Sequence, residues 1–334
     1  MASKPQALAF LLFALSTLSF IINASHAADQ PIRPSPVLTV YWGQNENEGT
    51  LREACATKNY EIVNLGFLNV FGNGRTPQLN FAGYCGDSSP CTKLAPEIRY
   101  CQNHNVKVFL SLGGAEGDYD LSSPQDAREV AQYLYNNFLN DQDGPLGRVS
   151  LDGIDFDIEI GSNRYYEDLV KALHEFSTEQ RRIYLSAAPR CRYPDHHLDA
   201  AIKTGLFNYI LGQFYNNPRC QYSKGNEQRL LNHFDMWARS VMPNNAVLLG
   251  LPAAPDAANS GFIPADVVKN QILPNIRNRP NYGGVMVWNR YYDRQTHFSR
   301  QIRDSLGPVL KSVAALADAM YECVTKTLYR FYPV

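Results

Sequence analysis

Eight short apolar runs, each rich in β-branched and aromatic residues, recur along the chain. They predict strands at 37–43, 61–71, 106–114, 151–159, 182–189, 209–217, 246–254 and 282–288. Segments with helical periodicity separate most of these runs, for example 124–139, 164–176, 226–241 and 264–276. Strands that alternate with helices pair in parallel through crossover connections, so the pattern indicates an α/β fold.

Eight such units in a chain of 334 residues predict a single (β/α)8 TIM barrel. A doubly wound open sheet is the alternative, but it usually has fewer strands or a phosphate-binding loop. The glycine cluster at 113–117 lacks that fingerprint. Because no linker, charge block or internal repeat divides the chain, we expect one domain over residues 28–305.

Both ends of the chain fall outside the barrel pattern. Residues 1–27 combine a lysine, an apolar run and a small-x-small site at Ser25-His26-Ala27, which indicates a cleaved signal peptide. A membrane anchor is the alternative, but no basic stop-transfer pattern follows. Residues 306–334 form an extension with helical spacing, interpreted either as a helix packed under the barrel or as a removable C-terminal sorting peptide.

Composition narrows the possible partners and compartments. Signal cleavage removes one Lys, so 31 − 1 = 30 basic residues remain beside 32 acidic ones. A nearly neutral chain argues against a nucleic-acid or anionic-membrane partner. Seven cysteines in a secreted chain predict disulfides with one thiol left over, and no spacing typical of a zinc site occurs. The only Asn-x-Ser/Thr triplet starts at Asn23, inside the signal, so we expect no N-glycan.

The stretch 151–159, LDGIDFDIE, contains four carboxylates in eight residues. Alternation of period two places Asp155, Asp157 and Glu159 on one face of a strand and the apolar residues on the other. Three like charges on one face repel one another, and at least one pKa must rise. Because stability does not favour this arrangement, it points to chemistry.

Polar and aromatic residues gather at the carboxyl ends of the predicted strands, where parallel barrels have their active sites. Glu159 ends the fourth strand, with Asp157 and Asp155 deeper. The others are Tyr41, Gln44, Asn69, Gln213, Tyr215 and Trp288. Aromatic faces stack on sugar rings and amides bond hydroxyls, so the set is typical of a sugar groove, although each residue alone is as often barrel filling. A non-catalytic carbohydrate-binding module is the alternative, but it leaves the three acids unexplained.

Here the chain resembles a known family. Asp152-x-x-Asp155-x-Asp157-x-Glu159 matches the DxxDxDxE signature of glycoside hydrolase family 18. Six further segments, at 41–45, 71–74, 111–114, 213–218, 250–254 and 282–286, are similar to plant class III chitinases of the hevamine type, and the likeness runs from about residue 37 to 304. The resemblance implies a monomeric, secreted endochitinase, extracellular or vacuolar, that acts on chitin or chito-oligosaccharides in plant defence without a metal or cofactor.

The resemblance also implies roles for residues. Glu159 would be the general acid, Asp157 would hold the acetamido N–H, Tyr215 would bond the acetamido oxygen, and Asp155 would share a proton with Asp157. The substrate's own acetamido oxygen would attack the anomeric carbon. Asp152, of opposite parity, would be structural. The implied substrate-binding residues are Tyr41, Gln44, Phe67, Asn69, Asn80, Gly114, Ala115, Gln213 and Trp288.

Three disulfides follow from the same resemblance: Cys55–Cys101, Cys85–Cys91 and Cys191–Cys220, with Cys323 unpaired. It also implies cis peptides at Gly66–Phe67 and Trp288–Asn289. The chain departs from the pattern at Ala115 and Glu116, where relatives commonly have a third glycine, and at Ile160, where they often have a polar residue.

Inactive members of the family inhibit xylanases or serve as lectins or storage proteins, and they typically lose the equivalent of Asp157, Glu159 or Tyr215. This chain keeps all three, although its segments 49–55 and 118–119 look like the inhibitor branch. An inhibitor, lectin or storage role is therefore the alternative to catalysis.

Overall fold

The computed structural model describes residues 35–85 and 90–307. The signal peptide expected at 1–27 and nearly all of the extension at 306–334, Cys323 included, lie outside the described residues. Within the described part of the chain, no helix has the length and hydropathy needed to cross a membrane. That part also gathers no group of three His, Cys, Asp or Glu side chains able to hold a metal ion.

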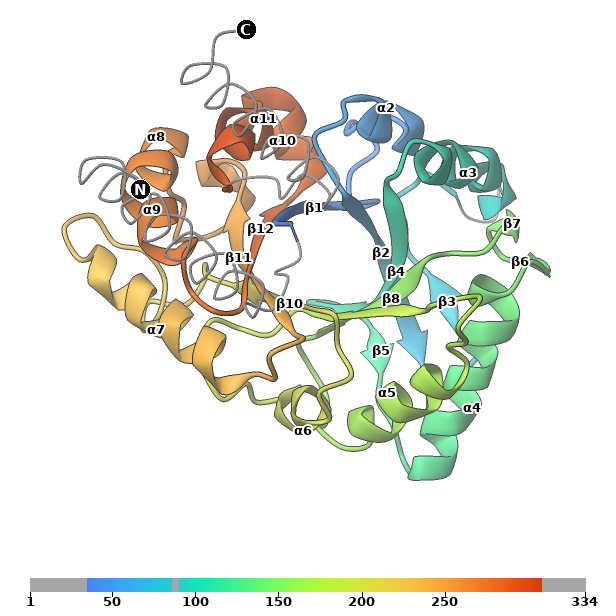
Figure 1. The fold of residues 1–334 in the computed structure, drawn as a ribbon. Helices are drawn as coiled ribbons and strands as arrows, with labels where there is room; N and C mark the ends of the chain where they lie inside the picture. The colour runs from blue at the N-terminus through green and yellow to red at the C-terminus, as the bar shows by residue number, and fades with distance from the viewer. Residues whose placement is uncertain (1–34, 86–89, 308–334) are drawn as a thin grey trace, which may run out of the picture. The chain divides into compact units, whose positions relative to one another are not determined.

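Eight parallel strands form a closed ring (Figure 1). They are β1 (Val37–Trp42), β2 (Ile62–Phe71), β4 (Lys107–Gly114), β8 (Gly153–Ile158), β9 (Tyr184–Ala187), β10 (Tyr209–Gln213), β11 (Ala246–Pro252) and β12 (Tyr282–Trp288). Each strand pairs with its neighbours in chain order, and β1 closes the ring by pairing with both β12 and β2. The predicted (β/α)8 barrel is confirmed, with all eight strands where the apolar runs place them.

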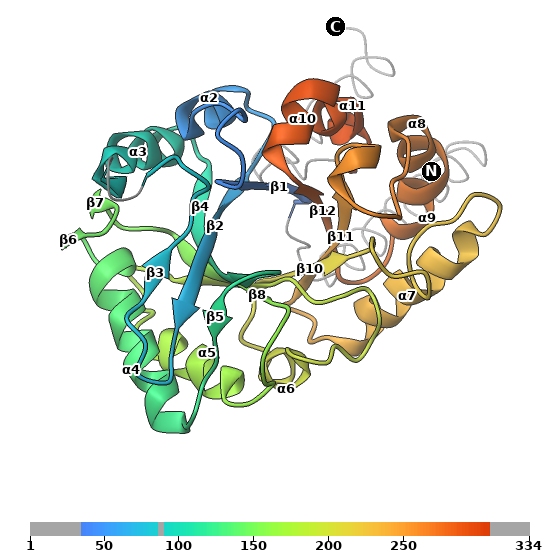
Figure 2. The same ribbon diagram turned by 180° about the vertical axis from the view of Figure 1, so that it is seen from behind.

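Helices surround the strand ring on every side (Figures 1 and 2). They are α2 (Leu51–Ala56), α3 (Ala95–Asn103), α4 (Pro124–Leu134), α5 (Tyr166–Glu175), α6 (Asp199–Lys203), α7 (Glu227–Ser240), α8 (Ala265–Val267), α9 (Leu273–Ile276), α10 (Arg290–Thr296) and α11 (Phe298–Ile302). A π-helical turn, Tyr135–Leu139, extends α4, and a second, Val268–Ile272, joins α8 to α9. The four helices predicted from periodicity are therefore present, two of them with π-helical segments.

Several short strands and turns lie outside the ring of eight strands. Strands β3 (Gln78–Leu79) and β5 (Asp118–Tyr119) both pair with the long strand β2, beside which Figure 2 shows them, while β6 (Asp143–Gly144) and β7 (Gly147–Arg148) pair with each other. Single 3-10 turns lie at Cys91–Leu94, Pro255–Ala257 and Arg303–Ser305. The β5 pairing matters for the site, because it brings Tyr119 to the carboxyl end of the barrel.

Burial on both faces explains the near-continuous apolar strands. The outward residues of β8, Ile154, Phe156 and Ile158, belong to the large core between the strands and the helices. A smaller apolar cluster inside the ring includes Leu211, Leu248 and Met286. At the level of Asp155 this interior turns polar, because the parallel register sets Ser111 of β4 and Ser186 of β9 beside that carboxylate.

Among the described residues, three disulfides are present, and they are the pairs that the family resemblance implies: Cys55–Cys101, Cys85–Cys91 and Cys191–Cys220. The first joins α2 to α3. The peptide bonds Gly66–Phe67 and Trp288–Asn289 are both cis, as the resemblance also implies.

Candidate active site

Strand β8 carries its acidic residues along a gradient of burial. Asp155 is 0% exposed and Asp157 3% exposed, whereas the side chain of Glu159, the first residue after Ile158, is 21% exposed. Since the carboxyl ends of barrel strands form the mouth of the fold, Glu159 lies nearest the solvent and Asp155 deepest. This order agrees with the sequence prediction.

Three hydroxyl groups hold the Asp155 carboxylate. Tyr41 Oη and Ser111 Oγ each donate to Oδ2 at 2.7 Å, and Ser186 Oγ donates to Oδ1 at 2.6 Å. Burial raises the pKa of Asp155, while these hydrogen bonds act in the opposite direction. Both oxygens of Asp155 thus accept hydrogen bonds from hydroxyl groups, and the structure shows no direct hydrogen bond between Asp155 and Asp157. The proton that the resemblance implies for this pair is therefore not held in a direct bond between the two acids.

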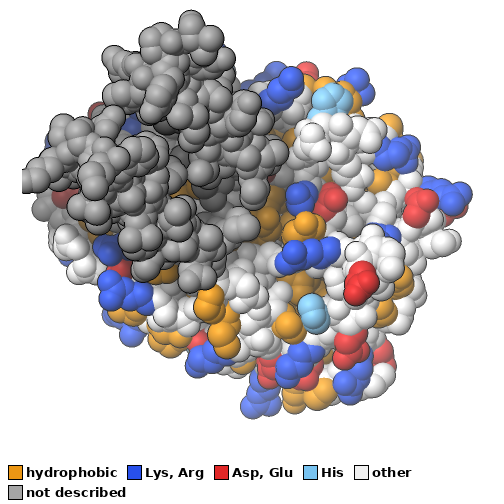
Figure 3. Space-filling model, viewed as in Figure 1, with side chains coloured by type: hydrophobic (Ala, Val, Ile, Leu, Met, Phe, Trp, Pro, Cys, Tyr) orange, Lys and Arg blue, Asp and Glu red, His pale blue; other side chains and the backbone are white. Residues whose placement is uncertain are grey.

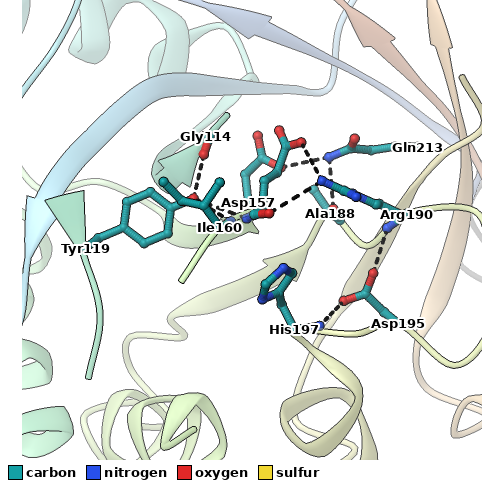
Figure 4. Close-up of polar contacts among 10 residues, drawn as sticks. Gly114, Tyr119, Asp157, Ile160, Ala188, Arg190, Asp195, His197 and Gln213 are labelled. Atoms are coloured by element: carbon teal, nitrogen blue, oxygen red, sulfur yellow. Dashed lines mark hydrogen bonds and ion pairs between the residues drawn. The ribbon is translucent and has the colours of Figure 1, made fainter. Parts of the chain in front are cut away.

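Asp157 is bound from the sixth barrel strand. Gln213 Nε2 donates to Asp157 Oδ1 at 2.8 Å and to the carbonyl oxygen of Ala188 at 3.1 Å (Figure 4). Burial raises the pKa of Asp157 well above its usual range, and the negative charges of Glu159 and Asp155 raise it further. A carboxyl in this position carries a proton more readily than an ordinary aspartate.

Glu159 has the environment of an acid that retains its proton. Burial raises its pKa above the ordinary glutamate value, whereas the positive charge of Arg190 lowers it. Arg190 Nη2 lies 3.9 Å from Glu159 Oε2. A partly exposed carboxyl with a raised pKa, at the mouth of a barrel, is suited to donate a proton to a bound substrate.

Tyr119 holds the backbone at Glu159 in place. Its hydroxyl accepts hydrogen bonds from Glu159 N at 3.1 Å and Ile160 N at 3.3 Å, and it donates to the carbonyl oxygen of Gly114. Figure 4 shows Tyr119 and Arg190 approaching this region from opposite sides. The tyrosine thereby ties the end of β8 to the end of β4.

Sequence reasoning missed both Tyr119 and Arg190 as members of the site. Arg190 comes directly after the predicted strand at 182–189, so the strand-end rule could have found it. Tyr119 had no comparable signal, because the two-residue strand β5 is recognisable only through its pairing with β2.

Three aromatic rings form a cluster beside the acids. Ring centroids lie 5.4 Å apart for Tyr41 and Trp288, 6.0 Å for Tyr41 and Phe67, and 6.3 Å for Phe67 and Trp288. Tyr41 is only 1% exposed, and Phe67 is buried as well, whereas Trp288 is half-buried. Trp288 is therefore the most accessible ring of the three. Tyr41 instead donates its hydroxyl to the buried Asp155.

Tyr215 lies two residues beyond the end of β10 and is buried. Burial raises the pKa of its hydroxyl well above the usual range, and the charges of Asp157 and Glu159 act in the same direction. The group is therefore a neutral phenol with a proton to donate, which is the form that its predicted role requires.

Of the remaining predicted residues, Gln44 and Asn80 lie on loops and Asn69 lies in β2. Gln44 Nε2 donates to Gly66 O at 2.7 Å and Asn80 O at 3.0 Å, and Asn80 in turn exchanges backbone hydrogen bonds with Phe67. Asn80 is exposed, whereas Gln44 and Asn69 are half-buried. These contacts bring the segments after β1 and β2 together.

The departure at Ala115 leaves the glycine turn intact. Gly113 and Gly114 take left-handed φ values of +98° and +92°, and Ala115, which is exposed, does not take such a value. A Cβ on Gly114 would lie 3.1 Å from the Phe67 ring, so glycine is needed there for space as well as for φ.

Asp152 lies at the other end of the strand and is structural. Its carboxylate accepts from Val108 N at 2.8 Å and from Gln102 Nε2 at 3.0 Å. The residue thus joins β8 to β4 and to the end of α3, away from the acids at the mouth.

Comparison with known proteins gives consistent matches. A model of the glycosyl hydrolases of family 18 matches residues 37–261. An acidic endochitinase of Cicer arietinum is 51% identical over 296 residues, covering 87% of this chain and 97% of the relative. A chitinase of Ipomoea carnea superposes with a TM-score of 0.77 at 48% identity, covering 80% of this chain and 99% of that one. A xylanase and α-amylase inhibitor protein of Scadoxus multiflorus has a TM-score of 0.76 at 42% identity, covering 80% and 98%.

Proposed function

Since this chain belongs to the glycosyl hydrolases of family 18, we propose that it is an endo-acting chitinase that cleaves β-1,4-linked N-acetylglucosamine polymers with retention of configuration. The observation that carries the proposal is the gradient along β8. Asp155 accepts hydrogen bonds from hydroxyl groups, and Asp157 accepts one from Gln213. Glu159 lies at the mouth of the barrel and has a raised pKa. Three clustered acids repel one another and do not stabilise the fold, but they can transfer a proton and balance a positive charge.

In the first half of the proposed reaction, Glu159 protonates the glycosidic oxygen as the bond to the anomeric carbon breaks. The carbonyl oxygen of the substrate's acetamido group attacks that carbon from the opposite side and forms an oxazolinium ion. The leaving sugar departs as a neutral alcohol. Because the nucleophile belongs to the substrate, the sugar at the reacting centre must carry an N-acetyl group.

Asp157 and Tyr215 would prepare that acetamido group. In its ionised form, the Asp157 carboxylate can accept the acetamido N–H and balance the positive charge of the oxazolinium, while the neutral Tyr215 hydroxyl donates to the acetamido oxygen and fixes its angle of attack. In the second half, Glu159 takes a proton from a water molecule, which attacks the anomeric carbon and restores the acetamido group. The product then has the same configuration as the substrate.

Activity is expected to decline as pH rises, because Glu159 must be protonated to act. Burial raises the pKa of this acid, so the protonated form persists above the pH at which an ordinary glutamate ionises and is lost only when the pH passes the raised value. Measurement of kcat/KM on a soluble chito-oligosaccharide across pH should show an alkaline limb that falls about tenfold per pH unit. A rate that continues to increase to pH 9 would exclude Glu159 as the acid.

Inhibition of a xylanase is a second candidate function, favoured by the likeness to the Scadoxus multiflorus inhibitor protein. Release of soluble sugar from colloidal chitin, measured beside a xylanase-inhibition assay, separates the two. We expect sugar release without inhibition. Inhibition without sugar release would favour the second function, and binding to chitin without cleavage or inhibition would favour a lectin role.

The expected setting is an oxidising compartment outside the cytosol, extracellular or vacuolar, with a role in plant defence. The three disulfides support this proposal. On the described part of the face in Figure 3, basic and acidic side chains are interspersed rather than gathered by sign, which supports a neutral sugar polymer rather than a nucleic acid as the partner. We expect a monomer.

A further inference from the structure

The guanidinium of Arg190 lies at the open end of the acidic cluster. Its Nη2 atom is 3.9 Å from Glu159 Oε2 and 3.4 Å from the backbone oxygen of Glu159. The Arg190 side chain is 56% exposed. In Figure 4 it extends from the segment after β9 toward Asp157 and Gln213. A solvated cation thus stands beside the acid that the proposed reaction uses.

Hydrogen bonds fix the backbone of Arg190 and thereby determine where its side chain leaves the chain. Arg190 N donates to Asp195 Oδ2 at 2.9 Å, and Arg190 forms a parallel β-bridge with Gln213. The next residue, Cys191, donates its N–H to Gln213 O at 3.1 Å and is joined by a disulfide to Cys220. The segment after β9 and the end of β10 are therefore joined where they hold Arg190 and the glutamine that binds Asp157.

The ion pair with Glu159 does not compensate the positive charge of Arg190 at the moment of reaction, although this charge also acts on Asp157. The Asp195 carboxylate accepts from the backbone N–H groups of Arg190, His197 and Leu198. Both carboxylate oxygens of Asp195 are therefore hydrogen-bonded to backbone N–H groups nearby in the sequence. Glu159, the ion-pair partner, is neutral when it is ready to donate its proton. A substrate that enters the competent site meets a cation there.

The proposed chemistry requires an acetamido group only on the sugar whose anomeric carbon reacts. Nothing in it restricts the sugar that leaves. Chitin that has lost acetyl groups carries 2-amino sugars, which are ammonium ions at acidic pH. A unit bonded to the oxygen that Glu159 protonates lies well within the screening length of about 8–10 Å around Arg190.

We propose that Arg190 is a specificity-determining residue that selects against a cationic 2-amino sugar in the leaving position. The proposal rests on the chitinase function and extends it: the acetamido requirement governs one side of the scissile bond, and the charge of Arg190 governs the other. Repulsion between two exposed like charges at this range lowers kcat/KM by about fivefold.

The test uses two soluble oligosaccharides of equal length, one fully N-acetylated and one with a single 2-amino sugar directly on the leaving side. The ratio of their kcat/KM values is measured at one acidic pH for the wild type, Arg190→Gln and Arg190→Lys. Mass spectrometry of the products verifies the bond that is cleaved. We expect Arg190→Gln to reduce the preference for the acetylated substrate about fivefold and Arg190→Lys to retain it.

Salt provides a second measurement that requires no variant. High ionic strength should weaken the preference of the wild type, because it screens exposed charges. An active wild type whose preference is unaffected by salt and by Arg190→Gln would overturn the role of Arg190 alone. A wild type that cleaves neither oligosaccharide would overturn the proposed function instead, so the two failures are distinguishable.

Discussion

Glu159→Gln is expected to lower the rate of chitin hydrolysis by about 10²–10⁴-fold while the barrel remains folded. Glutamine has nearly the same shape as glutamate but no acidic proton for the leaving oxygen. The side chain is only partly buried, and its ion-pair partner, Arg190, is 56% exposed, so the substitution leaves this positive charge in contact with solvent. Initial rates on a soluble chito-oligosaccharide measure the loss.

Glu175→Gln is the matched control, because it makes the same chemical change on the exposed surface of α5. Thermal unfolding of both variants checks that the fold is intact. If Glu159→Gln retained more than about a tenth of the wild-type rate, the proton would have to come from another group, and the assignment of Glu159 would be wrong.

Asp157→Asn is expected to lower the rate by about 10²–10³-fold through a different loss. The asparagine can still accept the Gln213 hydrogen bond through its carbonyl oxygen, but it has no negative charge with which to balance the oxazolinium ion. Its amide also replaces a carboxylate oxygen that would accept the substrate N–H. The effect should therefore appear chiefly in kcat.

Stability should change in the opposite direction in the same variant. The pKa of Asp157 is raised in the folded protein, so the native state favours the protonated form, and its stability falls as the pH rises above the unfolded-state value of about 4. Asparagine removes this titration. Thermal unfolding at neutral pH should thus show Asp157→Asn to be at least as stable as the wild type. A less active and clearly less stable variant would indicate a structural role.

The pattern of the sequence predicts the barrel well because burial of both strand faces leaves a strong and regular signal. It also predicts the order of the acids on β8, since parity and the direction of a barrel strand determine which carboxylate lies deepest. The π-helical turns that extend α4 and join α8 to α9 carry no such signal.

Contacts between distant strands are beyond this kind of reasoning. The hydroxyls around Asp155 come from Tyr41, Ser111 and Ser186, and only the register of four strands brings them to one carboxylate. The position of Tyr41 at a predicted strand end favours a place in the sugar groove, whereas in the structure its hydroxyl donates a hydrogen bond to the buried Asp155. Tyr119 reaches the site through a β5–β2 pairing too short to recognise in the sequence.

The central claim is that the substrate's own acetamido group is the nucleophile, so that hydrolysis retains configuration. Proton NMR of the reducing-end anomer in the first minutes of chito-oligosaccharide cleavage by the wild type tests it most directly, before mutarotation equilibrates the product. The account predicts that the β-anomer forms first. Initial formation of the α-anomer, or no cleavage at all, would contradict it.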